Sequence, residues 1–347
     1  MKAAIFDTFR QPLEVRDIAM PACPPDGVLV EVRACGVCRS DHHSWSGADP
    51  VALPHIPGHE FAGVVVETGP LCRRYRKGDR VTAPFILGCG ICPDCQAGHA
   101  TICNDQITLG FACWGAFAEF IAVPRADFNL VPLPASIGFE QAAAMGCRVT
   151  TAFQALLVRG RLQPGEWLAV HGCGGVGLAA IMIARAIGAR IVATDIRATA
   201  LALARAAGAD LTLDATQADL GEAVREATGG GAHLAVDALG IAATFDNSIR
   251  SLRKFGRHVQ IGMPVGSHVE VKLPLLDIVY ARQVSIIGSR GMPAAGFASL
   301  LAMVESGRLD LGPLIRRRIA LSEAGAALSA LDSFSGAGIT VIDRFAA

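Results

Sequence analysis

The sequence predicts an α/β protein that combines a doubly wound parallel sheet with a region of short β strands. Three observations support this fold class: segment type changes near residue 150, apolar runs then alternate with Ala-rich helical stretches, and a glycine-rich turn lies among them. Alternation of strands and helices builds a parallel sheet that is covered on both faces. The chain has 347 residues, which is enough for two domains with substantial cores.

The expected elements follow in chain order. Up to about Cys147, short strands such as Val28–Val32 and Phe61–Val66 are separated by Gly and Pro. Further strands are predicted at Trp167–Val170, Ile191–Thr194, Leu211–Leu213, Leu234–Ala238, His258–Ile261 and Val284–Ile287. Helices are predicted between several of them, at Gly177–Ile187, Thr199–Ala207 and Ala218–Thr228. From Arg290 onward, one helical stretch at Phe297–Ser306 precedes short strands.

Composition excludes several function classes. The formal net charge is +0, which gives no electrostatic support for a nucleic-acid or anionic-membrane partner. Short basic runs at Arg73–Lys77 and Arg316–Arg318 are interpreted as solvated loops or strand edges. No apolar run of about 18 residues and no signal-peptide pattern occurs. Eleven cysteines in metal-type spacing then indicate a reducing, cytoplasmic location.

Four cysteines with metal-binding spacing lie in the run CGICPDCQAGHATIC, at Cys89, Cys92, Cys95 and Cys103. Thiolates two or three residues apart on tight turns can converge on one tetrahedral Zn²⁺. Glycines and a proline interrupt the run, so we expect a loop around an ion rather than a helix or strand. Because four thiolates leave no open position, this zinc is predicted to stabilise a lobe and to do no chemistry. The alternative is a set of unrelated buried or oxidised cysteines.

A glycine-rich turn follows the apolar run WLAV and precedes the helical stretch LAAIMIARAIG; it consists of Gly172, Cys173, Gly174, Gly175, Val176 and Gly177. Glycines there permit a tight turn and close approach to a pyrophosphate, which binds at the helix N-terminus. Asp195 ends the next strand, and a carboxylate there accepts hydrogen bonds from the adenosine ribose and repels a 2′-phosphate. The sequence therefore predicts a Rossmann dinucleotide site that prefers NAD, while the nearby Arg197 leaves NADP as an alternative.

Candidate ligands for a second, catalytic metal occur in two short motifs. GVCRSDHH contains Cys38, Ser40, Asp41, His42 and His43, and GHE contains His59 and Glu60. Cys as thiolate and His as neutral imidazole are good zinc ligands, and three protein ligands with one open position make a catalytic site. Spacing alone neither joins Cys38 to His59 nor selects the third ligand. Taken singly, a free cysteine could instead be a small buried hydrophobe, and Asp41 or Glu60 a surface charge.

The chain resembles the zinc-dependent alcohol dehydrogenases of the medium-chain dehydrogenase/reductase superfamily. The resemblance rests on these two motifs, the four-cysteine loop, the isolated Cys147 in AAAMGCRVTTA and the glycine-rich turn GCGGVG. The resemblance covers essentially the whole chain. It implies a GroES-like β catalytic domain at residues 1–148 and 290–347, with a structural zinc lobe at about 88–104. It also implies an NAD-binding Rossmann domain at residues 149–289, two Zn²⁺ per chain and NAD as the coenzyme.

The resemblance also assigns roles to residues by position. The catalytic zinc ligands are matched by Cys38, His59 and Cys147, and the structural zinc ligands by Cys89, Cys92, Cys95 and Cys103. Glu60 matches an acid beside the ligating histidine that coordinates the metal in some states. Asp41 matches a carboxylate that orients the zinc-bound imidazole. Ser40 matches the hydroxyl that contacts the substrate oxygen, and His43, rather than its neighbour His42, matches the outer end of a proton relay.

The implied activity is reversible hydride transfer between an alcohol, bound to zinc as its alkoxide, and NAD, which gives an aldehyde or ketone and NADH. Phe85 matches a substrate-pocket position, and Trp45 and Trp114 are weaker pocket candidates, although each aromatic could equally belong to the core. The residues do not select the substrate. A polyol or amino-alcohol dehydrogenase of the same superfamily is therefore an alternative, and a non-catalytic zinc- and nucleotide-binding protein is a remote one.

By the same resemblance, the apolar strand Val284–Ile287 is predicted to join the Rossmann sheets of two subunits, since an open apolar edge tends to pair with another chain. We expect a homotetramer, with a homodimer as the alternative. The expected binding partner is a small-molecule alcohol, aldehyde or ketone, with no nucleic acid and no membrane. Five cysteines have no assigned role and are interpreted as packing residues: Cys23, Cys35, Cys72, Cys113 and Cys173.

Overall fold

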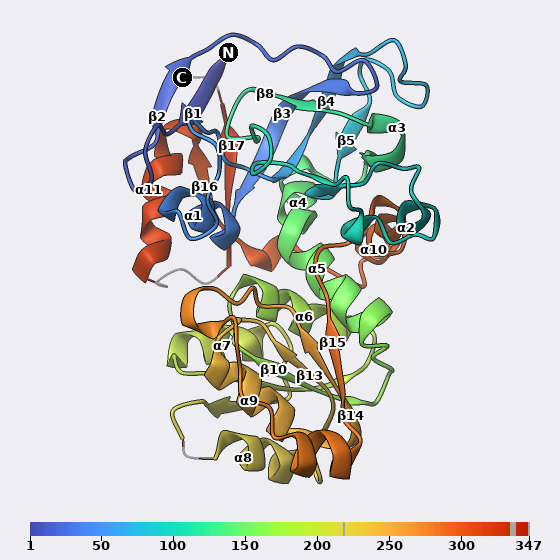
Figure 1. Ribbon diagram of the computed structural model, residues 1–347, viewed down its shortest axis with the longest axis vertical. Helices are drawn as coiled ribbons and strands as arrows, with labels where there is room; N and C mark the ends of the chain where they lie inside the picture. Colours follow the sequence, from blue (N-terminus) through green and yellow to red (C-terminus); the bar gives the residue numbers. More distant parts are fainter. Residues whose placement is uncertain (218, 334–337, 346–347) are drawn as a thin grey trace. The chain divides into compact units, whose positions relative to one another are not determined.

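The computed structural model describes residues 1–217, 219–333 and 338–345. The chain forms two compact units, one of Met1–Thr150 with Gly291–Ala347 and one of Thr151–Arg290 (Figure 1). Each unit has its own sheet and its own hydrophobic core. Within the described residues, no helix is long and apolar enough to cross a membrane.

The first unit is built on a mainly antiparallel sheet. In the described part of the chain its order is β16-β17-β3-β4-β5-β9, with β8 also paired to β3. The strands are β3 (Val28–Val37), β4 (Glu60–Thr68), β5 (Arg80–Thr82), β8 (Phe120–Val123), β9 (Val131–Pro132), β16 (Ile315–Ala320) and β17 (Ile339–Arg344). Two small pairs lie outside this sheet: β1 (Lys2–Ile5) with β2 (Glu14–Asp17), and β6 (Ile86–Leu87) with β7 (Ile107–Thr108).

Strand β3 is the centre of this sheet because it pairs with β4, β8 and β17. Its sequence VLVEVRACGV is largely apolar and most of its residues are buried. Phe61, Phe117 and Ile121 pack into the core beside it. A strand with neighbours on both sides and apolar residues on both faces is expected to be rigid, so residues at its carboxyl end are held in place.

The first unit also contains short helical segments. They are α1 (Arg39–Ser46), α2 (Pro93–Gln96), α3 (Ala126–Asn129), α4 (Phe139–Ala144), α10 (Phe297–Glu305) and α11 (Ala324–Ser329). Helix α4 continues into a π-helical turn at Met145–Val149, then into α5 (Thr150–Phe153) and a second π-helical segment, Gln154–Arg159. Helix α1 starts directly after β3, where the Cys38 N–H donates to Asp41 Oδ2 at 2.9 Å. This reciprocal contact is a capping box, which stabilises a helix N-terminus.

The second unit is a parallel sheet with the order β12-β11-β10-β13-β14-β15. Its strands are β10 (Trp167–His171), β11 (Arg190–Asp195), β12 (Leu211–Asp214), β13 (Ala232–Asp237), β14 (Leu252–Gln260) and β15 (Ser285–Gly288). Its helices are α6 (Gly175–Ala186), α7 (Ala198–Ala206), α8 (Leu220–Ala227) and α9 (Ala242–Arg250). This order is that of a Rossmann sheet, in which the first strand lies in the middle.

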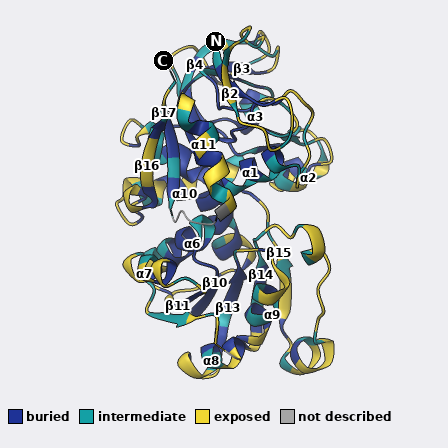
Figure 2. Ribbon diagram, turned by 90° about the vertical axis from the view of Figure 1, so that its left-hand side faces the viewer, coloured by how far each residue is buried: buried dark blue, intermediate teal, exposed yellow. Residues whose placement is uncertain are grey.

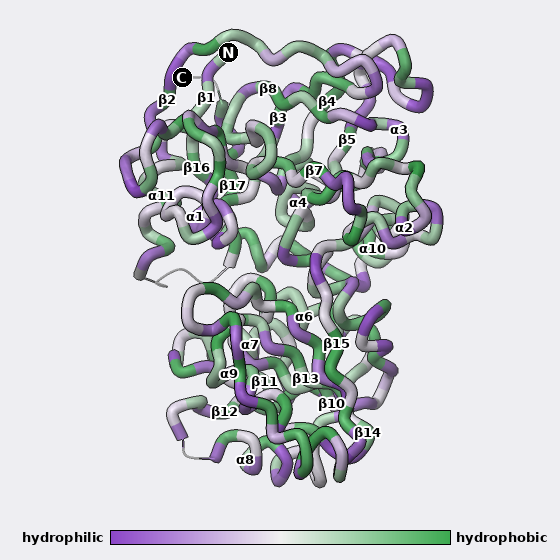
Figure 3. Tube along the Cα trace, viewed as in Figure 1, coloured by the Kyte–Doolittle hydropathy of each residue, from purple (hydrophilic) through white to green (hydrophobic). Residues whose placement is uncertain are grey.

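Burial in this sheet follows the order of its strands. Central strands β10 and β13 are almost wholly buried, whereas the edge strand β15 is largely exposed (Figure 2). Most residues of the central strands β10 and β13 are hydrophobic (Figure 3), as expected for strands covered on both faces. The prediction of a doubly wound α/β fold is therefore confirmed.

Each of the six predicted strands of this unit overlaps an observed one, and α6, α7 and α8 lie within two residues of their predicted bounds. Ala218, the predicted start of α8, lies outside the described residues. Sequence reasoning missed α9, whose stretch AATFDNSIR contains β-branched and Asn residues with low helix propensity. It also missed α1 and α4, which are too short to show a helical period within a region of strands.

Candidate metal centre and coenzyme site

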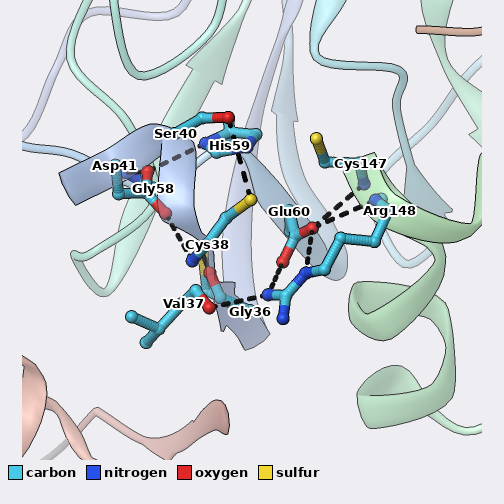
Figure 4. A network of polar contacts seen from close by, with 12 residues as sticks. Gly36, Val37, Cys38, Ser40, Asp41, Gly58, His59, Glu60, Cys147 and Arg148 are labelled. Atoms are coloured by element: carbon cyan, nitrogen blue, oxygen red, sulfur yellow. Dashed lines mark hydrogen bonds and ion pairs between the residues drawn. The ribbon is translucent and has the colours of Figure 1, made fainter. Parts of the chain in front are cut away.

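Four candidate metal ligands meet in the first unit. One ligand atom from each of Cys38, His59, Glu60 and Cys147 lies within 4.8 Å of the others, and all four residues are buried. Cys38 follows β3, His59 and Glu60 stand at the start of β4, and Cys147 belongs to the π-helical turn (Figure 4). The structure thus brings Cys147, as well as Glu60, to the two residues that spacing alone did not join.

Sheet register explains how these distant residues meet. In the antiparallel pair of β3 and β4, Gly36 lies opposite Glu60, so Cys38 and His59 come together just beyond the paired residues. The π-helical turn reaches the same place, because the Cys147 N–H donates to Glu60 Oε1 at 3.2 Å. Single π-helical turns occur frequently at functional sites.

Asp41 orients the candidate ligand His59 through hydrogen bonds. It is completely buried, and its Oδ1 accepts hydrogen bonds from the His59 Nδ1 at 2.8 Å and the Gly58 N–H at 3.0 Å. Since a carboxylate can only accept, the hydrogen bond holds a proton of His59 on Nδ1, which leaves Nε2 as the nitrogen that can bind a metal. Burial lowers the pKa of His59, but the charge and hydrogen bond of Asp41 outweigh it and raise that pKa above its ordinary value.

The residues present fit a metal ion. His59 Nε2 is buried and has no hydrogen-bond partner among the described residues, although a buried polar atom normally has one. An imidazole lone pair beside two thiols is a donor set that suits Zn²⁺. The hydrogen bond of the Cys147 thiol lowers the pKa of Cys38 well below its ordinary value, and Cys38 in turn raises that of Cys147. Cys38 is therefore the more acidic thiol of the two, and metal binding would release the protons of both.

Sequence reasoning missed Arg148 at this site. Its side chain is buried and forms an ion pair with Glu60, with Nη2 at 2.6 Å from Oε2 and Nε at 3.1 Å from Oε1. Burial raises the pKa of the Glu60 carboxyl, and the Arg148 charge opposes that change. The signal was available in the sequence: a lone arginine within the apolar run AAAMGCRVTTAF must be paired if it is buried.

The four-cysteine loop forms a second cluster. The ligand atoms of Cys89, Cys92, Cys95 and Cys103 also lie within 4.8 Å of one another. Backbone N–H groups donate to these sulfurs, for example Cys92 N to Cys89 Sγ at 3.3 Å and Cys95 N to Cys92 Sγ at 3.4 Å. Backbone hydrogen bonds lower the pKa of Cys89 to about 6, whereas burial raises that of Cys95 to about 12. The expectation of a loop without helix was wrong in part, because Cys95 lies on the single-turn helix α2.

The two neighbouring histidines of α1 have different surroundings. His42 is buried, and its Nε2 lies 2.7 Å from Asp332 Oδ1. His43 is half-buried, and burial lowers its pKa. Ser40 lies on the same helix, and the Cys38 thiol donates to its Oγ at 3.9 Å. Asp332 and the ring of Trp45 therefore hold His42 in the interior.

The aromatic pocket candidates are dispersed. The Phe85 ring lies 5.6 Å from the His59 ring between centroids, and Phe111, which sequence reasoning missed, lies at 5.3 Å. Trp45 is buried in the core and donates to Gln11 O at 2.6 Å. Trp114 is 43% exposed. Of the three predicted aromatics, Phe85 is the one whose ring contacts a candidate ligand.

The glycine-rich turn joins β10 to α6 in the second unit. Gly172 has a φ of +99°, which favours glycine, and a Cβ at Gly177 would lie 1.9 Å from Gly172 O. A Cβ at Gly174, the N-cap of α6, would meet nothing within 4 Å. Open space at a helix N-terminus with free N–H groups suits a phosphate.

Asp195 is close to this turn. Its Oδ2 accepts from the Cys173 N–H at 2.9 Å, and its Oδ1 accepts from the Arg197 N–H at 3.0 Å and from Arg197 Nε at 3.2 Å. The carboxylate therefore links the end of β11 to the glycine-rich turn, and Arg197 is paired with it.

Two family models match the chain: "alcohol dehydrogenase GroES-like domain" at residues 24–135 and "zinc-binding dehydrogenase" at residues 175–306. An alcohol dehydrogenase of Geobacillus stearothermophilus is 38% identical over 83% of this chain and 84% of its own. An NAD-dependent alcohol dehydrogenase of Sulfurisphaera tokodaii is 31% identical over 99% of both chains. The chain belongs to the zinc-binding alcohol dehydrogenase family. A solved alcohol dehydrogenase from Thermus sp. ATN1 matches this family member with a TM-score of 0.90 at 30% identity, over 99% of this chain and 100% of the other.

Membership in the zinc-binding alcohol dehydrogenase family confirms the resemblance and the GroES-like part of the predicted fold. The protein is therefore an oxidoreductase of this family, with one candidate four-cysteine metal site and one candidate Cys/His/Glu site. Relatives also include an L-threonine 3-dehydrogenase of Rhizobium etli, 30% identical over 99% of this chain and 98% of its own. A solved zinc-binding dehydrogenase from Sinorhizobium meliloti, bound to NADP, is 29% identical over 99% of both chains with a TM-score of 0.88.

Proposed function

We propose that this protein is an NAD-dependent zinc alcohol dehydrogenase that transfers hydride reversibly between an alcohol and NAD. The observation that carries the proposal is the buried set of Cys38, His59 and Cys147, in which His59 Nε2 has no hydrogen-bond partner among the described residues. Three such donors leave a fourth position of a tetrahedral ion for substrate.

Each residue around this set has a distinct task. Asp41 keeps the proton of His59 on Nδ1 and so keeps the Nε2 lone pair available to the metal. Bound zinc supplies Lewis acidity, which lowers the pKa of an alcohol hydroxyl. Ser40 lies beside the Cys38 ligand, and its hydroxyl would take the alcohol proton while it passes its own proton on. His43 lies one helical turn further and is half-buried, so it can pass the proton toward solvent, whereas His42 is held by Asp332.

The four-cysteine loop would hold the second zinc. Four sulfurs within 4.8 Å of one another complete a tetrahedral site with no position for substrate. Its role is then to stabilise the lobe at about 88–104, where the described apolar core consists mainly of the cysteines themselves with Ala100 and Phe128.

The second unit would bind the coenzyme. The open N-terminus of α6 suits the pyrophosphate, and Asp195 faces the turn that precedes it. A carboxylate at this position favours NAD, since it accepts from ribose hydroxyls and repels a 2′-phosphate. The pairing of Arg197 with Asp195 neutralises part of that charge, and one relative binds NADP. We therefore expect a preference for NAD rather than an absolute requirement.

Domain roles and assembly follow from the same proposal. The first unit corresponds to a catalytic domain of residues 1–148 and 290–347, and the second to an NAD-binding domain of residues 149–289. The edge strand β15 exposes Ile286, and the preceding π-helical segment exposes Leu275, Leu276 and Tyr280. An exposed apolar edge favours pairing with a second copy. We propose a homotetramer, with a homodimer as the alternative.

A polyol or amino-alcohol substrate is the second candidate, because relatives of nearly full length include L-threonine 3-dehydrogenases. A panel of simple alcohols, sorbitol and threonine, measured by NADH absorbance, would separate the two. Metal analysis of the purified protein comes first, and two zinc ions per chain are expected. Protein with one zinc or none and no NADH formation with any alcohol would contradict the proposal.

A further inference from the structure

Arg148 and Glu60 form a buried ion pair directly behind the candidate metal ligands. Glu60 is completely buried and Arg148 is 7% exposed. Two nitrogens of the guanidinium face the two carboxylate oxygens (Figure 4), which is the strongest geometry for such a pair. Burying two charges costs more than burying two apolar residues of similar size, so the pair is a poor choice for stability alone.

The carboxylate of Glu60 is fixed from several sides. Its Oε1 also accepts from the backbone N–H groups of Cys147 at 3.2 Å and Arg148 at 3.4 Å. A Cβ at Gly36 would lie 2.2 Å from Oε2, and a Cβ at Gly146 would lie 2.7 Å from the Glu60 Cα. The two glycines therefore leave just enough room for the carboxylate in this position.

Arg148 connects the surrounding elements to this carboxylate. Besides Glu60, Nη2 donates to Val37 O at 2.6 Å and Nη1 donates to Gly338 O at 3.4 Å. Val37 directly precedes the ligand Cys38, and Arg148 directly follows the ligand Cys147. One side chain thus spans the two backbone segments that carry the thiols, and it does so through groups other than the ligands.

Glu60 has an alternative partner. One of its oxygens lies within 4.8 Å of the Cys38, His59 and Cys147 ligand atoms, and an anion so close to a divalent cation is attracted to it. With a metal bound, the carboxylate would be attracted by the guanidinium on one side and by the metal on the other.

We propose that Arg148 is a positioning residue of the metal centre: it holds Glu60 against the Cys147 turn and off the metal, so that the fourth metal position stays open to substrate. This inference rests on the proposed function of the Cys38–His59–Cys147 site. Glu60 is then a potential metal ligand, and its ion pair with Arg148 determines how readily the carboxylate moves to the metal.

The test compares full-length proteins loaded with Co²⁺, whose visible absorption bands report the ligands and coordination number of the site. Arg148→Met frees the carboxylate, so the cobalt bands should change relative to wild type and the KM for alcohol should rise about tenfold, the size of coupling common within one polar network. Adding Glu60→Gln removes the anionic ligand. The double variant Glu60→Gln/Arg148→Met should therefore recover the wild-type cobalt bands and most of the lost affinity.

Two further variants separate positioning from a general loss of stability. Arg148→Lys keeps the charge without the two-point contact, so its cobalt bands should lie between those of wild type and Arg148→Met. Arg257→Met removes an ion pair with Glu166 in the second unit and should lower the melting temperature without changing the cobalt bands. If Arg148→Met does not fold, the double variant and Arg148→Lys still decide the matter.

Cobalt bands that are the same in Arg148→Met, Arg148→Lys and wild type would overturn the inference. So would bands in the double variant that remain like those of Arg148→Met, because the change would then not come from Glu60. If wild-type protein holds two zinc ions and oxidises alcohols in these cases, this inference alone fails. If wild-type protein binds no metal at the Cys38 site, the proposed function and the inference fail together.

Discussion

The two cysteine clusters use the same chemistry but arise in different ways. The four-cysteine cluster lies on one short loop, its outer thiols Cys89 and Cys92 are half-buried, and backbone N–H groups of the loop face its sulfurs. The cluster of Cys38, His59 and Cys147 is assembled from β3, β4 and a π-helical turn, and it is buried. A local site needs only turns of the right length, whereas a distant one needs correct sheet register.

Their charges differ as well. Four thiolates around Zn²⁺ would leave two negative charges, which backbone N–H donors of the loop offset in part. Two thiolates neutralise the two positive charges of Zn²⁺, and a neutral imidazole adds none. The additional negative charge of Glu60 is balanced by Arg148. The first arrangement closes the metal, and the second leaves room for a reacting oxygen.

The largest expected effect tests whether the Cys38 site is catalytic and the four-cysteine site is structural. Cys38→Ser should reduce turnover on the order of 10³-fold, since the ligand is lost from a Lewis-acid site that supplies several kcal/mol, while the melting temperature stays near that of wild type. Cys95→Ser should instead lower the melting temperature, by about 5 °C for a loss of about 2 kcal/mol. Thermal denaturation and NADH formation measure both. A stable Cys95→Ser protein together with a fully active Cys38→Ser protein would reverse the assignment of the two sites.

The proton path sharpens the description of the open site. Ser40→Ala should remove most activity at every pH, because Ser40 is the group proposed to touch the substrate oxygen. His43→Ala should cost about 10²-fold, at the low end for general acid–base groups, since water can replace a residue near solvent. Its deficit in alcohol oxidation should shrink as pH rises or when imidazole is added. A deficit that responds to neither would assign His43 a structural role.

Coenzyme choice is expected to respond less strongly. Asp195→Ser removes the charge that repels a 2′-phosphate and frees Arg197 from its ion pair. The ratio of kcat/KM for NAD to that for NADP should then fall about tenfold or more, corresponding to the loss of one charged contact. The matched control is Asp214→Ser, which changes an exposed carboxylate at the end of the neighbouring strand β12. Wild-type protein that prefers NADP would contradict the role of Asp195 in selecting NAD.

The smallest effect on activity is expected for the buried histidine His171, whose hydrogen bonding differs from that of His59. His171 has both ring nitrogens occupied, by Thr194 Oγ1 at 3.1 Å and Ser251 Oγ at 3.2 Å, so it has no free donor for a metal. Burial lowers its pKa to about 3, below the value of about 6.5 in an unfolded chain. The unfolded state then binds more protons, and stability should fall as the pH drops from about 6.5 toward 3.

This stability effect can be isolated by mutation. His171→Gln keeps a polar partner but cannot take up the proton, so its free energy of unfolding should depend less on pH between 4 and 6.5, by an amount on the order of a few kcal/mol. Denaturant titrations at several pH values measure the difference, with His233→Gln as a more exposed control. Equal pH slopes for wild type and His171→Gln would show that this histidine does not govern acid stability.

Some features could be predicted from the sequence because they are local. The alternation after residue 150 predicts the parallel sheet, and each of its strands was found in place. The spacing of Cys89, Cys92, Cys95 and Cys103 predicts their convergence, since turns of two residues keep the first three sulfurs close and a short loop returns Cys103 to them. The glycine-rich turn is equally local, as its glycines are required by the backbone itself.

Other features were decided by tertiary structure. The register of β3 against β4 brings Cys38 to His59, and the π-helical turn adds Cys147 and Arg148; no short-range pattern in the sequence contains either fact. Burial of His42 against Asp332 likewise depends on a residue from the far end of the chain. The physical reason is that spacing along the chain limits distances only within a few residues. Contacts between distant segments follow from how apolar strands pack and pair, and these contacts determined which of the reactive side chains meet.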